Sequence, residues 1–301
     1  MNTTDDMHMD TTDGMHMNAA DEMHADPAAG ADTASAACTL TFLGTAAGCG
    51  VPSFFCTCAA CESARRDSSR ARGCSGVVVT SGGENTLIDM PPDLRHQLSR
   101  ESIAHIERVL LTHAHFDHMG GAGELEYYVR VERDEPLPLL ASEFALSECS
   151  REFGYMRECF DADAIEPYGT RVFGGLTVQA LPLVHVSGTY GYLITAPSSS
   201  RTFYAPDTGA LRPEVAEILR GVDNLVMDSS YWGENPRPTR HMSAQETVRV
   251  AIDELGAGRV YLTHLAPHMG GREDWVALVE EYAAGYDGRV VVAADGMRIE
   301  L

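Results

Sequence analysis

Short apolar runs separated by Gly and Pro dominate the chain from Cys38 onward. Runs of about four to eight residues rich in β-branched and aromatic side chains predict strands, and apolar residues at helical spacing predict helices. The predicted strands are Thr39–Leu43, Gly76–Thr80, Thr86–Asp89, Arg108–Thr112, Leu137–Leu140, Leu176–Leu183, Tyr190–Thr195, Thr202–Ala205, Asn224–Met227, Arg259–Thr263, Arg289–Ala293 and Met297–Leu301. The predicted helices are Pro92–Ser99, Gly120–Val131, Ser142–Phe153, Pro213–Arg220, Ser243–Leu255 and Glu273–Ala284. This grouping predicts an α/β fold of two packed sheets with helices outside.

Residues 1–37 differ from the rest of the chain, because they are rich in Asp, Thr, Ala and Met and contain no Arg. So little apolar surface cannot offset the entropy of ordering, and we expect a disordered acidic tail. Within it a Met-His pair recurs every eight residues, at positions 7, 15 and 23. These pairs are either soft-metal ligands suited to copper or part of an ordinary solvated tail. No Pro-, Gly- or Ser-rich linker divides 38–301, so we expect one domain there.

The charge balance narrows the classes of partner. The chain has 44 Asp and Glu against 22 basic residues, all of them Arg, and a formal net charge of −22. Such a surface disfavours nucleic-acid binding, since a broad basic face is lacking. No apolar run approaches the roughly 18 residues of a membrane span, and the N-terminus lacks a signal peptide, which predicts a cytoplasmic protein with no membrane partner. The 8 Cys residues are then expected to be free thiols or metal ligands.

The most informative segment is His113-Ala114-His115-Phe116-Asp117-His118, which follows the predicted strand Arg108–Thr112. Polar groups at the end of a buried strand need partners, and metal ions supply them. His113 and His115, two apart on an extended segment, can share one metal. Asp117 and His118, in the turn into the next helix, can serve a second.

Three further residues of ligand type follow other apolar strands: His185, Asp207 and His264. Residues at strand ends open onto loops, where a rigid scaffold presents chemistry. Each alone is equally consistent with an ordinary polar residue at the edge of the core. Together with the first cluster they predict a metal site.

Cys56, Cys58 and Cys61 form a C-x-C-x₂-C cluster in the loop 56–61. Three thiolates this close can share a structural zinc if a fourth ligand arrives from elsewhere, for which His268 is the candidate. The alternatives are three reduced surface thiols or a redox motif. The remaining cysteines have no such spacing and are expected to be buried or incidental thiols: Cys38, Cys49, Cys74, Cys149 and Cys159.

These motifs, in their order along residues 38–301, resemble the metallo-β-lactamase superfamily. The resemblance implies an αββα sandwich of two mixed sheets flanked by helices, with two divalent ions along one edge. It implies that Asp207 bridges the two ions and that a hydroxide between them is the nucleophile. Zn²⁺, Mn²⁺ and Fe²⁺ all suit the donor set. The implied ligands are His113, His115 and His185 for one ion, and Asp117, His118 and His264 for the other.

The cysteine loop, with Arg65-Arg66 and Gly73-Cys74-Ser75-Gly76 downstream, resembles the phosphoribosyl 1,2-cyclic phosphate phosphodiesterases of phosphonate metabolism. It also resembles coenzyme PQQ biosynthesis protein B. The first resemblance is stronger because the whole two-metal set is present, and it extends to Asp228-Ser229-Ser230, Arg240-His241 and Asp295-Gly296-Met297. In this sequence His268 lies four positions after His264, whereas in the family pattern the corresponding histidine lies three positions after.

That resemblance implies hydrolysis of a cyclic phosphodiester on a small sugar phosphate, a homodimer, and catalytic roles for Asp117 and His241. His241 would protonate the departing sugar oxygen or steady the phosphoryl oxygens; on sequence alone it is equally a histidine at a helix start. Arg65, Arg66 and Arg240 are either phosphate clamps or surface charges.

Other functions would use the same metal ligands. A ribonuclease Z-type RNA-processing phosphodiesterase would need a basic arm that this sequence lacks. A β-lactamase or thioester hydrolase would use the metals on a carbonyl, and a PQQ-pathway accessory protein would bind metal without catalysis.

Overall fold

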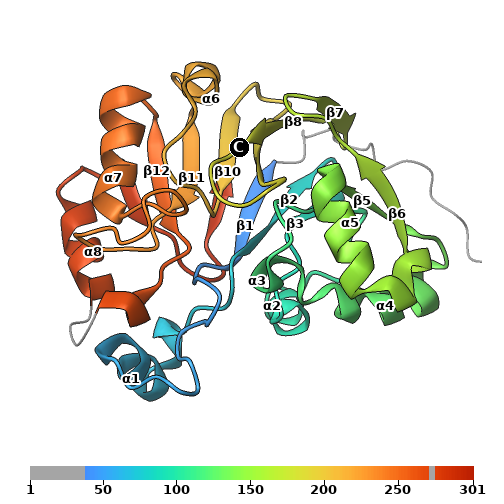
Figure 1. Ribbon diagram of the computed structural model, residues 1–301, viewed down its shortest axis with the longest axis horizontal. Coiled ribbons are helices and arrows are strands. Elements are labelled where there is room, and N and C mark those ends of the chain that lie inside the picture. The colour runs from blue at the N-terminus through green and yellow to red at the C-terminus, as the bar shows by residue number, and fades with distance from the viewer. Residues whose placement is uncertain (1–37, 271–274) are drawn as a thin grey trace, which may run out of the picture. The chain divides into compact units, whose positions relative to one another are not determined.

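In the computed structural model, which describes residues 38–270 and 275–301, the apolar runs form two seven-stranded sheets (Figure 1). The first sheet has the order β14-β1-β2-β3-β4-β5-β6 and the second the order β13-β12-β11-β10-β9-β8-β7. The strands of the first sheet are β1 (Thr39–Gly44), β2 (Gly76–Ser81), β3 (Glu84–Ile88), β4 (Arg108–Leu110), β5 (Leu137–Ala141), β6 (Phe160–Ala164) and β14 (Arg298–Glu300). Those of the second are β7 (Thr170–Phe173), β8 (Leu176–Pro182), β9 (Tyr190–Thr195), β10 (Arg201–Ala205), β11 (Asn224–Asp228), β12 (Arg259–Thr263) and β13 (Val290–Val292).

Helices flank both sheets. The α-helices are α1 (Ala59–Arg66), α2 (Leu94–Arg100), α3 (Phe116–Met119), α4 (Leu125–Tyr127), α5 (Glu143–Glu152), α6 (Pro213–Leu219), α7 (Ala244–Arg249) and α8 (Trp275–Ala284). Shorter 3₁₀ and π turns are η1 (Ser68–Arg70), η2 (Ala122–Glu124), η3 (Tyr128–Arg133), η4 (Gly154–Cys159), η5 (Val250–Glu254) and η6 (Pro267–Gly270). The Ser243 side chain accepts from the Glu246 amide, and the Glu246 side chain accepts from the Ser243 amide, so a capping box starts α7.

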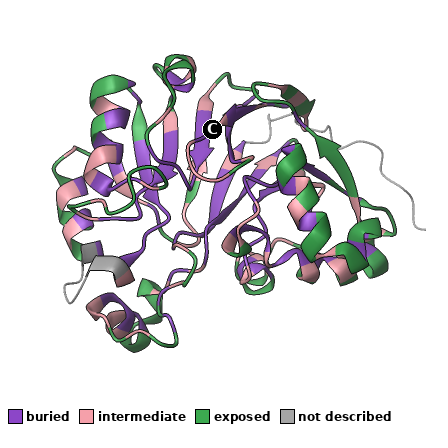
Figure 2. Ribbon diagram, viewed as in Figure 1, coloured by how far each residue is buried: buried purple, intermediate pink, exposed green. Residues whose placement is uncertain are grey.

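The core lies in three apolar layers, which follow from the alternation of side chains along each strand. Leu40 and Phe42 of β1 pack between the two sheets with Tyr204 and Val226 of the second sheet. Outward-facing residues of the first sheet pack against α2, α4 and α5, and those of the second pack against α6, α7 and α8. Buried strands between helices with exposed outer faces are visible in Figure 2. The predicted αββα arrangement is therefore confirmed.

The strand directions bring particular chain ends to one edge of each sheet. β3, β4, β5 and β6 are parallel neighbours, as are β10, β11, β12 and β13, while the remaining pairs are antiparallel. Both sheets are thus mixed, as expected. Because the carboxyl ends of parallel strands meet at one edge, the loops after β3, β4, β10, β11 and β12 are the natural places for a site.

Three features differ from the sequence-based expectation. The edge strands β6 and β7 were not predicted, because their partly exposed sequences contain no apolar run and their structure depends on pairing with β5 and β8. α1 was not predicted either. The expected helix Gly120–Val131 is instead divided among η2, α4 and η3, and the short helix α3 precedes it. Gly121 directly precedes η2, and a Cβ there would lie 2.0 Å from the Pro91 carbonyl oxygen, so only glycine fits at this position.

The predicted acidic tail, residues 1–37, lies outside the described residues. Among residues 38–270 and 275–301, no helix is long and apolar enough to cross a membrane.

Candidate metal centre

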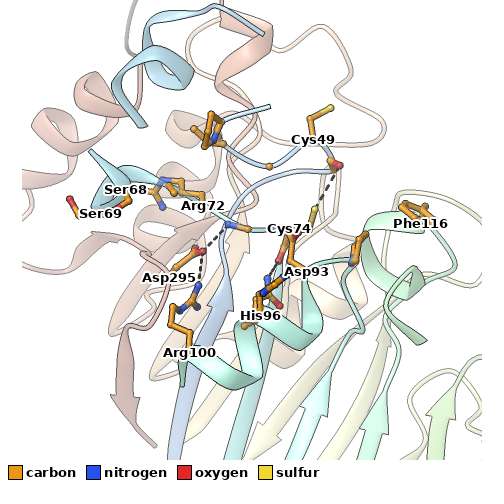
Figure 3. A pocket seen from close by; sticks show the side chains of 18 residues that line it. Cys49, Ser68, Ser69, Arg72, Cys74, Asp93, His96, Arg100, Phe116 and Asp295 are labelled. Carbon is orange, nitrogen blue, oxygen red and sulfur yellow. Dashed lines mark hydrogen bonds and ion pairs between the residues drawn. The ribbon is translucent and has the colours of Figure 1, made fainter. Parts of the chain in front are cut away.

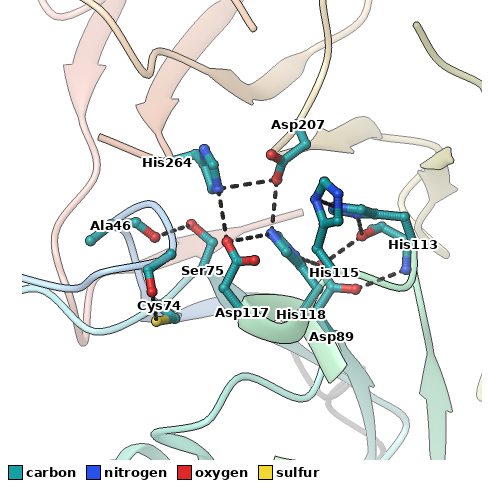
Figure 4. Close-up of polar contacts among 12 residues, drawn as sticks. Ala46, Cys74, Ser75, Asp89, His113, His115, Asp117, His118, Asp207 and His264 are labelled. Atoms are coloured by element: carbon teal, nitrogen blue, oxygen red, sulfur yellow. Dashed lines mark hydrogen bonds and ion pairs between the residues drawn. The ribbon is translucent and has the colours of Figure 1, made fainter. Parts of the chain in front are cut away.

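Loops at the ends of four strands bring the seven predicted His and Asp ligands together, and all of them except His185 are labelled in Figure 4. Residues 113–118 follow β4 and enter α3, His185 follows β8, Asp207 follows β10, and His264 follows β12. His113, His118, Asp207 and His264 are buried, so the fold fixes much of the cluster.

Three imidazoles form the first group. His115 Nδ1 lies 2.9 Å from His113 Nε2 and 3.1 Å from His185 Nε2. Burial is the main reason that the pKa of all three histidines is lowered, so their neutral forms are favoured. Three neutral ring nitrogens face one another here, and a proton shared between two of them leaves the third without a partner. A metal ion can accept the lone pairs of all three.

Asp207 links this group to the second one. Its Oδ1 lies 3.6 Å from His185 Nε2, whereas its Oδ2 lies 2.8 Å from His118 Nε2 and 3.2 Å from His264 Nε2. Asp117 completes the second group, with its Oδ2 3.4 Å from His118 Nε2 and 3.5 Å from His264 Nε2. One carboxylate therefore presents a different oxygen to each group, as a bridging ligand does.

Unpartnered atoms test whether the residues fit metal ions. His118 Nε2, Asp207 Oδ2 and His264 Nε2 are buried, and none makes a hydrogen bond to any residue that the structure describes. They approach one another closely without hydrogen-bond geometry. Burial opposes charge on His118 and His264, but Asp207 and the other carboxylates beside the two rings together outweigh it, so the pKa of both rings is raised. Buried, converging lone pairs beside a carboxylate fit a divalent ion, so the donor set suits a two-metal centre.

Hydrogen bonds behind the rings fix which nitrogen faces the centre. His118 Nδ1 donates to Asp89 Oδ2 over 2.8 Å, and His185 Nδ1 donates to the Arg240 carbonyl over 2.7 Å. His264 Nδ1 lies 3.0 Å from the Ser230 hydroxyl. Such outer partners orient metal-ligating imidazoles and set their tautomer.

Asp89 and Asp228, for which no role was predicted, support the centre through His118 and His241. Asp89 is fully buried and also accepts from the Thr112 amide and hydroxyl, at 2.8 Å and 3.0 Å. Both carboxylates stand where an apolar strand ends, directly after β3 and as the last residue of β11. The strand-end rule that singled out His185 could have found them.

Two of these residues have left-handed backbone. Asp89 has φ 69° and His264 has φ 57°. Residues other than glycine adopt this region at a cost of about 1–3 kcal/mol, which the surrounding structure has to offset. Such strain is common where a side chain is aimed into a functional site.

His241 lies against the centre without belonging to either group of three. Its ring stacks on His264, with centroids 5.6 Å apart and planes at 12°, and its Nδ1 lies 2.9 Å from Asp228 Oδ2. Asp207, Asp228, His241 and His264 also have ligand atoms within 4.8 Å of one another. However, both Asp228 oxygens already accept hydrogen bonds, from His241 and from Ser230. His241 is therefore oriented by a carboxylate, with Nε2 left unbonded among the described residues.

The structure brings His268, the candidate fourth ligand, beside the three cysteines of the cluster. His268 Nδ1 lies 3.2 Å from Cys56 Sγ, 3.3 Å from Cys61 Sγ and 3.8 Å from Cys58 Sγ. His268 Nε2 donates to the Gly50 carbonyl over 2.8 Å, so Nδ1 carries the lone pair toward the sulfurs. A hydrogen bond from the Cys58 amide lowers the pKa of Cys56 to about 7. Three sulfurs and one nitrogen match the donor set of a structural zinc site.

The three candidate phosphate-binding arginines separate in the structure. Arg65 donates to the Ser53 carbonyl and to Glu62, each over 2.6 Å, and so holds the cysteine loop. Arg66 is exposed on the same helix, α1. Arg240 alone of the three contacts the His/Asp centre, through its carbonyl on His185.

A cavity of about 610 Å³, drawn in Figure 3, lies next to the segment that carries His115 and Asp117, although none of the seven ligands lines it. Phe116, which stands between the ligands His115 and Asp117, lines it, as do Cys74 and Gly48. A Cβ on Gly48 would lie 3.1 Å from Asp117 Oδ2, so the glycine keeps the approach to that ligand open. The cavity is large enough for a small molecule.

Comparisons with known proteins agree with this arrangement. A family model for the beta-lactamase superfamily domain matches residues 84–265. An octanoyltransferase from Porphyromonas gingivalis is 26% identical over 273 residues, which are 86% of this chain but only 52% of that protein, so the chain spans about half of that relative. Among solved structures, a diphosphatase from the PhnP family is 28% identical with TM-score 0.75, covering 88% of this chain and 97% of that one. Zn²⁺-bound PqqB from Methylobacterium extorquens is 23% identical with TM-score 0.73, covering 87% and 100%, and shows the fold alone.

Proposed function

Because the chain belongs to the beta-lactamase superfamily, we propose that it is a metal-dependent hydrolase of phosphodiesters, acting on a cyclic phosphodiester of a small sugar phosphate. Its membership confirms the resemblance predicted from the strand-end motifs, and the two mixed sheets flanked by helices are the metallo-β-lactamase fold. The likeness to a diphosphatase of the PhnP family supports phosphorus chemistry for this chain.

The proposed ligands are His113, His115 and His185 for one divalent ion and Asp117, His118 and His264 for the other, with Asp207 between them. Two such ions supply Lewis acidity toward phosphoryl oxygens and a nucleophile derived from water at neutral pH. One observation supports this proposal above all: the two carboxylate oxygens of Asp207 face two separate groups of imidazoles.

The residues of the chain supply positioning and a proton. The combined charge of two divalent ions exceeds that of Asp117 and Asp207, so the centre attracts an anionic diester despite the net charge of −22. Asp228 holds the His241 ring through Nδ1, and Nε2 can then donate a proton to the oxygen that leaves phosphorus. An imidazole suits this transfer because its ordinary pKa lies close to neutral pH.

A panel of substrates tests the proposed reaction. Purified protein loaded with Mn²⁺ is expected to hydrolyse bis(p-nitrophenyl) phosphate, and to turn over a chromogenic β-lactam and a thioester far more slowly. Faster turnover of the lactam or the thioester would overturn the assignment to phosphodiesters.

The proton-donor role of His241 makes a sharper prediction. In a series of aryl phosphodiesters, His241→Ala should cost about 10²–10⁴-fold in kcat for leaving groups of high pKa, and much less for p-nitrophenolate, which leaves without a proton. The matched control is His105→Ala, which removes an exposed histidine before β4. An equal loss across the series would show that His241 acts in another way.

We also propose that Cys56, Cys58, Cys61 and His268 hold one structural Zn²⁺. Metal analysis of the purified chain is then expected to give about three ions per chain. A single zinc that stays with the cysteines would instead favour a non-catalytic accessory protein.

A further inference from the structure

Ser230 lies behind the His/Asp centre, shortly after the end of β11, and it is buried. Its hydroxyl oxygen is 2.7 Å from Asp228 Oδ1, 3.0 Å from His264 Nδ1 and 3.2 Å from His241 Nδ1. The hydroxyl therefore contacts three groups at once: a proposed metal ligand, the proposed proton donor and the carboxylate that orients the donor.

Asp228 decides where the hydroxyl proton of Ser230 goes. This carboxylate is fully buried, and the amide and hydroxyl of Ser230 donate to its Oδ1 over 2.8 Å and 2.7 Å. The Thr208 amide and His241 Nδ1 donate to its Oδ2 over 3.0 Å and 2.9 Å. A carboxylate has about four lone-pair sites, so these donors fill it. Because a buried charge depends on its donors, the hydroxyl proton stays with Asp228.

The oxygen of Ser230 is then left to accept hydrogen bonds from the two rings. His264 Nδ1 has to carry a proton and donate it to this oxygen, which leaves the lone pair on Nε2. That Nε2 is the atom that faces the centre, 3.2 Å from Asp207 Oδ2. The hydroxyl thus selects the tautomer of His264 that can bind a metal ion.

The same oxygen helps to place His241. The proton on His241 Nδ1 points to Asp228 Oδ2 at 2.9 Å and to Ser230 Oγ at 3.2 Å. His241 belongs to neither group of three proposed ligands, so its ring is held beside His264 by these contacts and by the stacking of the two rings, whose planes differ by 12°. Ser230 is bonded to both members of this stacked pair.

We propose that Ser230 is a positioning residue that couples the metal ligand His264 to the proton donor His241, by setting the tautomer of the first and the place of the second. This inference rests on the proposed function and adds a residue to its mechanism. The oxygen that leaves phosphorus has to meet His241 while the substrate is bound at the centre, and one hydroxyl fixes the two rings relative to each other.

Ser230→Ala removes the hydroxyl without adding volume. With Mn²⁺ at saturation, kcat should fall by about 10-fold or more for aryl phosphodiesters whose leaving groups have a high pKa, and much less for p-nitrophenolate, with KM changed by less than about threefold. Ser229→Ala is the matched control, because Ser229 is equally buried and its hydroxyl donates to the Met227 carbonyl instead. It should keep the dependence on the leaving group. An equal loss of kcat in the two variants would show a merely structural role.

A double substitution tests whether Ser230 acts through His241. In a His241→Ala background, Ser230→Ala should lower kcat for the same substrates by less than about threefold, because the proton donor is already absent. If the losses of the two single variants simply multiply, Ser230 acts independently of His241 and the proposed coupling is wrong.

Two measurements need no turnover and separate this inference from the proposed function. In equilibrium dialysis against Zn²⁺, Ser230→Ala should bind one ion about 10-fold or more weakly, while Ser229→Ala should not. In the unmodified protein loaded with Zn²⁺, long-range ¹H–¹⁵N correlations of the imidazoles should place the proton of His264 on Nδ1. If no phosphodiester is hydrolysed, the proposed function fails, and these measurements still decide whether Ser230 sets the His264 tautomer. A proton on His264 Nε2, or unchanged zinc affinity in Ser230→Ala, would overturn it.

Discussion

The His/Asp centre draws its ligands from the ends of β4, β8, β10 and β12, which lie in two sheets. The Cys/His cluster instead takes its three cysteines from one short segment, in which Cys56 and Cys58 precede α1 and Cys61 lies in its first turn. In the first region His118, His185 and His264 are each oriented from behind by another residue. In the second, His268 has such a partner in the Gly50 carbonyl.

The difference concerns what holds each region together. The strand ends of the His/Asp centre are fixed by the sheets, so its geometry is set before any ion binds. The cysteine loop has less support, chiefly from Arg65 and from α1, which starts directly after Cys58. We infer that metal in the first region serves reaction, and that metal in the second contributes to the stability of the loop itself.

Asp207→Ala gives the largest expected effect, because it removes the carboxylate that faces both groups of imidazoles. Turnover of bis(p-nitrophenyl) phosphate should fall by about 10³-fold or more, with metal content reduced and the thermal transition retained. Asp161→Ala, at an exposed position of β6, is the control and should behave as the unmodified chain. Near-normal turnover in Asp207→Ala would remove the basis for calling the first region catalytic.

Asp89→Asn tests whether the support behind the ligands matters. Asp89 accepts three hydrogen bonds, from His118 Nδ1 and from the amide and hydroxyl of Thr112, and an amide has only one oxygen for them. Metal affinity or turnover should fall by roughly 10- to 100-fold. Asp134 is a fitting control because it also has left-handed backbone, φ 57°, but is exposed. If Asp134→Asn and Asp89→Asn give equal losses, the backbone rather than the His118 contact is responsible.

Cys61→Ser should affect stability far more than catalysis. We expect one metal ion fewer per chain and a melting temperature lower by about 5 °C or more, while turnover stays within roughly threefold. Cys49→Ser, which changes an exposed thiol outside the cluster, should leave the metal content and the melting temperature unchanged. His268 lies only four residues after His264, so a large loss of turnover in Cys61→Ser would mean that the two regions are coupled and the contrast between them is wrong.

The sequence predicts the metal ligands of the two regions, but not every residue or strand that supports them. Residues of metal-ligand type that follow apolar strands could be grouped into one site from the sequence, because strand ends in a layered α/β fold share an edge. This group comprises the ligands in residues 113–118 together with His185, Asp207 and His264. The role of Asp89 was not predicted, since a lone carboxylate after a strand shows its partner only once the strands are placed. β6 was missed for a related reason: its sequence has no apolar run, and pairing with β5 makes it a strand.

The smallest effects are expected for Arg65→Ala and Arg66→Ala, the two candidate phosphate-binding arginines that do not contact the His/Asp centre. Arg65 is one-third exposed and bonds the Ser53 carbonyl and Glu62, so its loss should loosen the cysteine loop by less than about 1 kcal/mol, a shift of about 2–4 °C at most. Arg66, its exposed neighbour on α1, makes no ion pair or hydrogen bond with the described residues and should shift the melting temperature by less. Neither change should alter KM for a phosphodiester, because neither side chain reaches the His/Asp centre. A raised KM in Arg65→Ala would instead place the cysteine loop at the substrate, and the loop would then contribute to binding as well as to stability.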